Sequence, residues 1–209
     1  MVLFSQISIA DVRELRDALE IYTASFPANE RHSVDVIRER LARGRYIFVV
    51  GKEREEIVFF ALLWPLMGSE FVVLDYMATR SDRIGRGIGS ALLNKITAMP
   101  ELAGKHLVME VERPVAGKNQ GQAVKRLEFY RRQGAKELTG VRYFMPGLAG
   151  GPPTEMILMV LPPYDEGKID AAKVRRMILQ IYQELYNREA EDSLLNSFAG
   201  EAAGPIQLT

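Results

Sequence analysis

The stretch at residues 81–96, "SDRIGRGIGSALLNKI", places glycine at positions 85, 87 and 89 and then continues as an apolar helix. Backbone N–H groups at the start of a helix are unpaired and carry partial positive charge. A glycine-rich turn that opens a helix therefore typically binds an anion. The stretch predicts a phosphate site, and the type of phosphate decides the fold.

Two common nucleotide-binding patterns do not fit this turn. The dinucleotide fingerprint Gly-x-Gly-x-x-Gly would need its third glycine at Ser90 or Leu92, and the P-loop would need Gly-Lys followed by Ser or Thr. The apolar runs at 46–50, 57–64 and 71–77 predict antiparallel strands where a βαβ unit would be expected. The hypothesis of an unrelated α/β protein that binds ATP or NAD is supported by the glycine turn alone.

The composition limits the other classes. The 209 residues, 47% of them hydrophobic, suffice for one core or for one core with an appendage. With 27 basic and 27 acidic side chains, the charge gives no case for nucleic acid or an anionic membrane as partner. Cysteine is absent, which excludes disulfides, thiolate metal sites and a cysteine nucleophile, and we expect no metal. The longest apolar run is interrupted by Pro65 and the first residues lack a signal-peptide pattern, so we expect a cytoplasmic protein.

The remaining chain has the pattern of a mixed α/β domain. Periodicity predicts helices at 11–24, 88–98 and 122–133, and strands at 3–7, 106–111 and 156–161. After a Pro/Gly-containing linker, residues 170–189 predict one amphipathic helix, and the end from Ser197 is expected to be loose. That helix cannot bury its apolar stripe alone, so it packs either on its own domain or across a homodimer interface.

The glycine turn resembles the pyrophosphate loop of the GCN5-related N-acetyltransferase (GNAT) superfamily, whose pattern is Arg/Gln-x-x-Gly-x-Gly/Ala. Gly87 and Gly89 fill the glycine positions, whereas Ile84 departs from Arg/Gln, with Arg83 one place away. The segment "RLEFYRRQG" at 126–134 is similar to the second motif of the family, although Ala123 stands where Asn is usual. With "EVERP" at 110–114, "VRYFMP" at 141–146 and "MILMVLPP" at 156–163, the chain looks like a less-studied bacterial branch of the superfamily.

The resemblance covers roughly residues 1–163 and implies a GNAT-type acyl-CoA N-acyltransferase fold. This is a central, mostly antiparallel, bent sheet with helices on both faces, here followed by a helical extension at 164–209. The implied function is transfer of an acetyl group from acetyl-CoA to a primary amine of a small molecule or peptide. A non-catalytic acyl-CoA-binding sensor or scaffold of the same fold is the alternative.

The resemblance also implies where the cofactor binds. Backbone groups of the strand before the turn would hold the pantetheine arm and the thioester, and the turn itself would hold the pyrophosphate. The expected acetyl-CoA-binding residues are Met77, Ala78, Thr79, Ile84, Gly85, Arg86, Gly87, Ile88, Gly89 and Ser90.

Acetyl transfer also needs proton handling, because the amine loses a proton and the departing thiolate gains one. Tyr130 is implied as the proton donor, since a tyrosine is protonated at pH 7. Asp75 lies inside an apolar strand, and Glu110 lies inside another with Glu112 at its end. An acidic residue in such a place is costly unless it is paired or functional, so any of the three could be the base, directly or through water. Salt-bridge or solvated roles for these carboxylates, and a reaction without a dedicated base, stay open.

The acceptor side is predicted from two stretches that border the acceptor pocket in the resembled family. In the segment 25–33, Glu30 would attract an amine and Arg31 a carboxylate, although a polar interhelical loop explains the same residues. Tyr143, in an aromatic stretch before the last predicted strand, would line the opposite wall. The sequence does not identify the acceptor.

Overall fold

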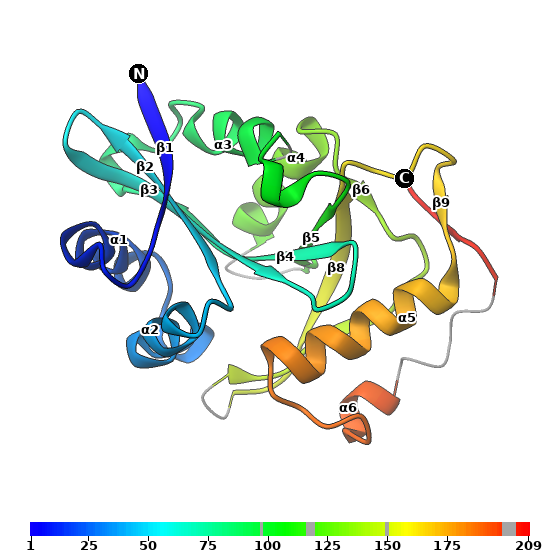
Figure 1. The fold of residues 1–209 in the computed structure, drawn as a ribbon. Coiled ribbons are helices and arrows are strands. Elements are labelled where there is room, and N and C mark those ends of the chain that lie inside the picture. Colours follow the sequence, from blue (N-terminus) through cyan, green and yellow to red (C-terminus); the bar gives the residue numbers. More distant parts are fainter. Residues whose placement is uncertain (97, 116–119, 149–150, 198–203) are drawn as a thin grey trace. The chain divides into compact units, whose positions relative to one another are not determined.

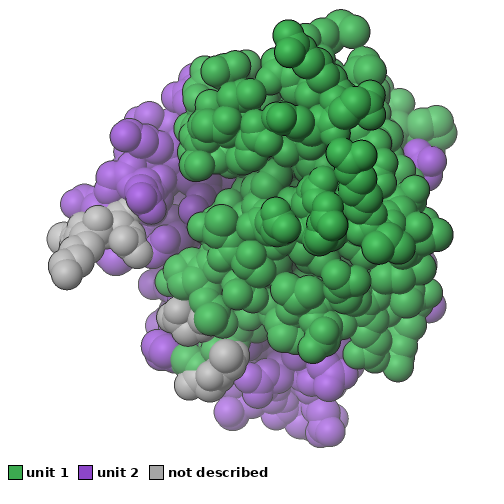
Figure 2. Space-filling view, turned by 90° about the vertical axis from the view of Figure 1, so that its left-hand side faces the viewer, with its two compact units in different colours: residues 1–65, 74–100, 147–151 green, residues 66–73, 101–146, 152–209 purple. Residues whose placement is uncertain are grey.

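The computed structural model describes residues 1–96, 98–115, 120–148, 151–197 and 204–209. The fold is mixed α/β, as predicted, with a mostly antiparallel sheet and flanking helices. The chain divides into two compact units (Figure 2): unit 1 is residues 1–65, 74–100 and 147–151, and unit 2 is residues 66–73, 101–146 and 152–209. Within the described residues, no helix is both long and apolar enough to cross a membrane.

Unit 1 contains an antiparallel sheet with helices on both faces. Val50 pairs with Ser5 on one side and with Phe60 on the other. Successive residues of a strand point to opposite faces, so the ring of Phe60 meets Tyr22 of α1 while the ring of Phe59 meets Phe4, over which Lys95 of α3 lies. Helices α1 and α2 therefore cover one face and α3 the other (Figure 1). The elements are β1 (Val2–Ile7), α1 (Val12–Ser25), α2 (Val34–Ala42), β2 (Ile47–Glu53), β3 (Glu56–Pro65), residues 74–79 of β4 (Phe71–Thr79) and α3 (Ile88–Ile96).

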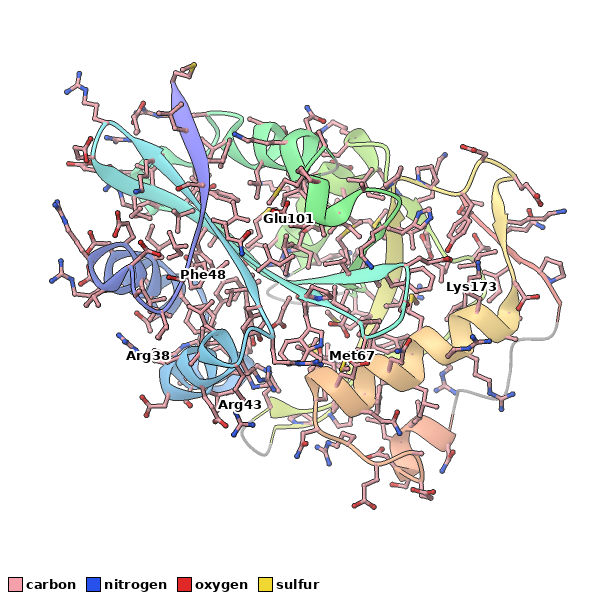
Figure 3. The ribbon with its side chains drawn as sticks, in the orientation of Figure 1. Arg38, Arg43, Phe48, Met67, Glu101 and Lys173 are labelled. Carbon is pink, nitrogen blue, oxygen red and sulfur yellow. The ribbon has the colours of Figure 1, made fainter. Side chains whose placement is uncertain are left out.

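The burial of these elements agrees with the apolar patterns of their sequences. Phe48 of β2 is fully buried (Figure 3), and β3 is buried along eight consecutive residues from Ile57 to Trp64, as a central strand requires. Ser33 caps α2 by accepting a hydrogen bond from the Val36 N–H at 3.3 Å. Arg43, just after α2, is exposed and pairs with Glu39.

Unit 2 is built around two central strands. Strand β5 pairs in parallel with the start of β4, with Phe71 opposite His106, and antiparallel with β8, with Leu158 opposite Glu110. The short strands β6 and β7 also pair with β8, and helices α4 and α5 lie on opposite faces of β5 and β8 (Figure 1). The elements are β5 (His106–Glu112), α4 (Gln120–Arg132), β6 (Lys136–Glu137), β7 (Tyr143–Met145), β8 (Thr154–Leu161), β9 (Lys168–Ile169), α5 (Ala171–Gln180), η5 (Ile181–Leu185), α6 (Ser193–Asn196) and β10 (Ile206–Gln207).

The C-terminal segment differs from the prediction in two ways. The expected single helix over 170–189 is α5 followed by one π-helical turn, η5, after which Asn187 adopts a left-handed conformation at φ 52°. At this end of the helix, the hydroxyls of Tyr182 and Tyr186 donate to acceptors in unit 2. The expectation of a loose end is wrong for residues 204–209, since β10 pairs with β9 and the Glu137 N–H donates to the Thr209 carbonyl at 2.8 Å; residues 198–203 lie outside the description.

The apolar stripe of this segment is buried within the single chain. Met177, Ile181, Tyr182 and Leu185 are all fully buried. Lys173 of α5 forms an ion pair with Glu70 at 2.8 Å and lies over the ring of Tyr164 (Figure 3). The C-terminal segment is therefore an integral part of unit 2.

Candidate active site

The glycine turn of unit 1 has the geometry of an anion-binding helix start. Gly85 and Gly87 adopt left-handed backbone conformations at φ 82° and 74°, which only glycine adopts readily. The Gly87 carbonyl accepts the first helical hydrogen bond of α3, from the Ala91 N–H at 3.0 Å. The N–H groups of Ile88, Gly89 and Ser90 thus belong to the first turn, where a helix offers no acceptor of its own. A Cβ atom added at either left-handed glycine would meet nothing within 4 Å, so the backbone is open to approach.

Ion pairs with carboxylates hold the residues that precede the glycines of this turn. Arg83 donates to Glu53 at 2.9 Å and to Asp82 at 2.7 Å, and Arg80 donates to Glu56 at 3.0 Å and to Asp82. These ion pairs tie the turn to the β2–β3 connection and occupy the guanidinium of Arg83. Arg86, at the tip of the turn, is exposed and has no ion-pair partner in the described part of the chain.

The position that carries Arg or Gln in the resembled pattern is Ile84, whose side chain is 70% exposed. Arg86 is thus the cation of the turn that is available to a phosphate. The residues Met77, Ala78 and Thr79 precede the turn at the end of β4, and their side chains are half-buried. Beside them, the Arg80 N–H donates to the Val58 carbonyl at 2.8 Å, so β3 flanks this end of β4.

Asp75 of β4 belongs to a polar chain inside unit 1. The Tyr46 hydroxyl donates to its carboxylate, and Arg40 donates to the same hydroxyl at 3.1 Å. Burial, assisted by the negative charge of Asp75, raises the pKa of Tyr46 well above its usual value. The guanidinium of Arg40 also lies 5.1 Å from the centre of the Trp64 ring. Asp75 is therefore a paired internal carboxylate, not a solvated strand residue.

The two charged residues predicted in the loop between α1 and α2, Glu30 and Arg31, have different surroundings. Arg31 donates to the Phe26 carbonyl at 2.9 Å and lies over the Tyr22 ring, so it stabilises the loop itself. Glu30 is exposed. His32, which the sequence analysis did not single out, has a buried Nε2 without a hydrogen-bond partner in the described residues. Burial, with a smaller contribution from Arg40, lowers the pKa of His32 to about 4.

Glu110 lies in unit 2, where two tyrosines hold its carboxylate. Tyr143 of β7 donates to Oε1, and Tyr186, just after η5, donates to Oε2 at 2.8 Å. Burial raises the pKa of Glu110, and the two hydrogen bonds oppose this rise without cancelling it. A carboxylate with a raised pKa is suited to take a proton near neutral pH.

Tyr130 lies on the buried face of α4 together with Ala123 and Leu127, and its side chain is 8% exposed. Burial raises the pKa of Tyr130 to about 12, although Arg126 acts in the opposite direction. The phenol is therefore protonated at neutral pH, as a proton donor must be. This observation is also compatible with a tyrosine that packs at the end of a helix.

The predicted site residues fall into two sets. Unit 1 holds the turn, the end of β4, Asp75 and the α1–α2 loop; unit 2 holds Glu110, Tyr130 and Tyr143. Of the predicted residues, Glu110 and Tyr143 are in direct contact. Tyr46, His32 and Tyr186 were not among the residues predicted from the sequence. The spacing of Tyr182 and Tyr186, four residues apart on the apolar stripe, was the signal available for Tyr186.

A glycine-opened helix after a strand of a mostly antiparallel sheet is the arrangement that the resemblance to the acyl-CoA N-acyltransferases implies. A family model described as the acetyltransferase (GNAT) family matches residues 15–135, more than half of the chain. The chain belongs to this family. The match includes the turn, Asp75, Glu110 and Tyr130, whereas Tyr143 and Tyr186 lie beyond it. No curated protein matches the chain in sequence.

Solved structures agree with this assignment. A GNAT-family protein from Bacteroides thetaiotaomicron has a TM-score of 0.74 and 25% identity, over 90% of this chain and 99% of its own. An aminoglycoside 6'-N-acetyltransferase in complex with coenzyme A has a TM-score of 0.58 and 18% identity, over 78% of this chain and 99% of its own. The ribosomal-protein-S18-alanine N-acetyltransferase of Escherichia coli has a TM-score of 0.56 and 20% identity, over 78% of this chain and 94% of its own.

Family membership confirms the resemblance, the fold and the enzyme class expected from the sequence. The protein is an N-acetyltransferase that uses acetyl-CoA as its acetyl donor.

Proposed function

We propose that the enzyme transfers the acetyl group to a primary amine by direct attack of the amine on the thioester. The new bond joins the amine nitrogen to the carbonyl carbon, and the carbon–sulfur bond breaks, so that no covalent enzyme intermediate forms. The absence of cysteine in the sequence supports this route. The observation that carries the proposal is the environment of Glu110. Two tyrosines donate to its carboxylate, and burial raises the pKa of Glu110.

The turn and the preceding strand would bind the cosubstrate. The first N–H groups of α3 would hold the pyrophosphate, with Gly85 and Gly87 allowing the close approach and Arg86 adding a positive charge. As the family resemblance implies, the backbone at residues 77–79 would hold the pantetheine arm. These roles need backbone groups above all, so Ile84 in place of Arg or Gln is compatible with binding.

Two proton transfers complete the reaction. Glu110 would take a proton from the ammonium form of the acceptor, which frees the nitrogen lone pair that attacks the thioester, and Tyr130 would give its proton to the departing thiolate. Asp75 is the second candidate base, because it also lies within a strand and is part of a hydrogen-bonded chain. We favour Glu110 as the base. The Tyr46 hydroxyl that donates to Asp75 itself accepts a hydrogen bond from the cation Arg40.

The acceptor would be a small molecule or a peptide with a primary amine. The similar structures include enzymes named for an aminoglycoside and for an alanine of a ribosomal protein, so both kinds of acceptor belong in a first screen. Exposed Glu30 would attract the amine and Tyr143 would line the acceptor side, while Arg31 is a weaker candidate because it holds its own loop. We further propose a catalytic domain at 1–163 with the extension 164–209 packed on it.

The test measures release of the coenzyme A thiol with a chromogenic thiol reagent, which the cysteine-free chain cannot itself consume. The acceptor panel would contain kanamycin, spermidine, free lysine and a peptide that begins with alanine. Glu110→Gln and Tyr130→Phe should each lower kcat about 100-fold with acetyl-CoA affinity unchanged, whereas Asp75→Asn should lower it less. If Asp75→Asn abolished turnover and Glu110→Gln did not, the base would be Asp75. Tight acetyl-CoA binding without turnover on any amine would favour the non-catalytic alternative.

A further inference from the structure

The C-terminal segment delivers two tyrosines into unit 2 through its π-helical turn. Tyr182, within η5, is fully buried and donates to the Phe144 carbonyl. Tyr186, one turn further on, donates to Oε2 of Glu110 at 2.8 Å. Single π turns are rare in helices and are frequently found at functional sites. Here the turn coincides with the point where the segment meets the proposed base.

The carboxylate of Glu110 is held at both oxygens. Tyr143 comes from β7 on the sheet side and Tyr186 comes from the C-terminal segment, so the two donors belong to different parts of the chain. Two donors on two oxygens fix the plane of a carboxylate and favour its ionised form, in which both oxygens accept. A base must be in this form before the amine proton is transferred.

We propose that Tyr186 is a positioning residue of the acetyl transfer, whose hydroxyl holds Glu110 in the orientation and ionised form needed to accept the proton of the incoming amine. The proposal rests on the role of Glu110 given above. It adds a function for the extension that follows the family match at residues 15–135. Tyr186 acts through Glu110, so it is not itself a catalytic residue.

The groups that face Glu110 are few in the described residues. Tyr143 lies on β7, and Tyr182 and Tyr186 lie on or beside η5. On β5, Glu112 shares the face of Glu110 by strand alternation, and across the ladder on β8 the partner is the apolar Leu158. The charges of Asp192, of Glu110 itself and of Arg188 act electrostatically on Tyr182.

The experiment compares Tyr186→Phe with Tyr182→Phe in the full-length protein. Both changes remove one hydroxyl from the same segment and keep the ring; Tyr186 donates its hydroxyl to Glu110, whereas Tyr182 donates its own to the Phe144 carbonyl. The first readout is the titration midpoint of the Glu110 carboxyl carbon by ¹³C NMR, assigned by its absence in Glu110→Gln. Since hydrogen bonds from tyrosine stabilise the carboxylate, Tyr186→Phe should move the midpoint upward by about one pH unit, and Tyr182→Phe should leave it in place. Tyr143→Phe should move it in the same direction.

The second readout is the acid limb of kcat/KM against pH, with acetyl-CoA and the best amine of the panel above. In Tyr186→Phe the acid limb should shift upward together with the NMR midpoint. An unchanged midpoint in Tyr186→Phe, or an equal shift in Tyr182→Phe, would overturn the proposal. A midpoint that moves while the acid limb stays would also overturn it. Failure of the proposed function looks different, because Glu110→Gln would then keep its turnover whatever Tyr186→Phe does to the midpoint.

Discussion

At the scale of single residues, the backbone geometry of Gly87 allows a direct test of the proposed cosubstrate site. Its φ of 74° is strained for any residue with a Cβ, at a cost of about 1–2 kcal/mol, although the added atom itself would find open space. We therefore expect Gly87→Val to distort the amides at the start of α3 and to weaken acetyl-CoA binding at least about tenfold. Calorimetric titration with acetyl-CoA, and with ATP and NAD for comparison, measures this loss.

Gly44 provides a matched control for that substitution. It also lies in unit 1, follows a helix, has a φ of 66° and is surrounded by open space. Gly44→Val should therefore lower the melting temperature as much as Gly87→Val does, with acetyl-CoA affinity unchanged. If Gly87→Val and Gly44→Val bind acetyl-CoA with the same affinity, the turn does not bind the pyrophosphate. Binding of ATP or NAD that is lost in Gly87→Val would instead indicate another class of nucleotide-binding protein.

His32 should make the protein sensitive to acid. Burial lowers its pKa to about 4 in the folded state, against 6.5 for the exposed ring. A base whose folded pKa is depressed stabilises the fold above pH 6.5, and this contribution is lost as the pH falls through 4. The difference amounts to at most about 3 kcal/mol. Urea unfolding at pH 7, 5.5 and 4.5 should show a steep loss in the wild type and a smaller loss in His32→Phe.

The other histidine, His106, serves as the control for His32. It stacks on Tyr164 and bonds to the Pro162 carbonyl in unit 2, whereas His32 belongs to unit 1. His106→Phe should keep the steep acid dependence of the wild type. If both histidine variants lose stability with acid as the wild type does, the buried neutral ring of His32 is not the cause.

At the scale of elements, the C-terminal helix depends on its first turn. The Asp170 carboxylate accepts a hydrogen bond from the Lys173 N–H at 3.1 Å and so caps α5. Asp170→Ala should lower the free energy of unfolding by about 1 kcal/mol, as loss of such a cap usually does. Asp165→Ala, an exposed position in the preceding linker, removes the same charge without a cap and should cost little. Chemical denaturation of both variants at one pH distinguishes them, and equal losses would mean that charge, not capping, matters.

The sequence was most informative where an element is long enough for its period to be counted. Strand β3 and helices α1, α3 and α4 lie close to the predicted ranges because each repeats its apolar spacing over several residues. Strands β6, β9 and β10 have two residues each, too few for any period, and were missed. The π turn was missed for another reason, since its apolar stripe is the same as that of a continuous helix and only contacts made elsewhere in the chain end it at Leu185.

The candidate site shows the same limit. Asp75 and Glu110 could be singled out because a carboxylate within an apolar strand is conspicuous in the sequence. The pairing of these carboxylates with tyrosines could not be predicted, because Tyr46 is 29 positions from Asp75, and Tyr143 and Tyr186 are 33 and 76 positions from Glu110. Only the folded chain brings these hydroxyls to the carboxylates, so the identity of a partner is a property of the topology.

At the scale of the whole molecule, the extension at 164–209 is expected to be needed for folding as well as for the site. Four of its large side chains, Met177, Ile181, Tyr182 and Leu185, are fully buried in unit 2. A chain that ends at Pro163 would expose the surfaces that they cover and would lose the ion pair of Lys173 with Glu70. We expect residues 1–163 alone to aggregate, or to melt more than about 10 °C below the full chain, since even one buried Met or Leu replaced by Ala costs about 2–5 kcal/mol.

Met177→Ala in the full-length chain separates loss of packing from loss of the whole segment. It removes one buried side chain of α5 while the hydrogen bonds of Tyr182 and Tyr186 keep their donors, so stability should fall and acetyl-CoA affinity should stay. Circular dichroism measures the melting temperatures of the 1–163 chain and of Met177→Ala, and sedimentation velocity detects their aggregation. Sedimentation of the wild type also gives its oligomeric state. A soluble 1–163 chain with the wild-type melting temperature would contradict the prediction. It would mean that the surfaces under α5 are stable in water, and that the extension serves Glu110 without serving the fold.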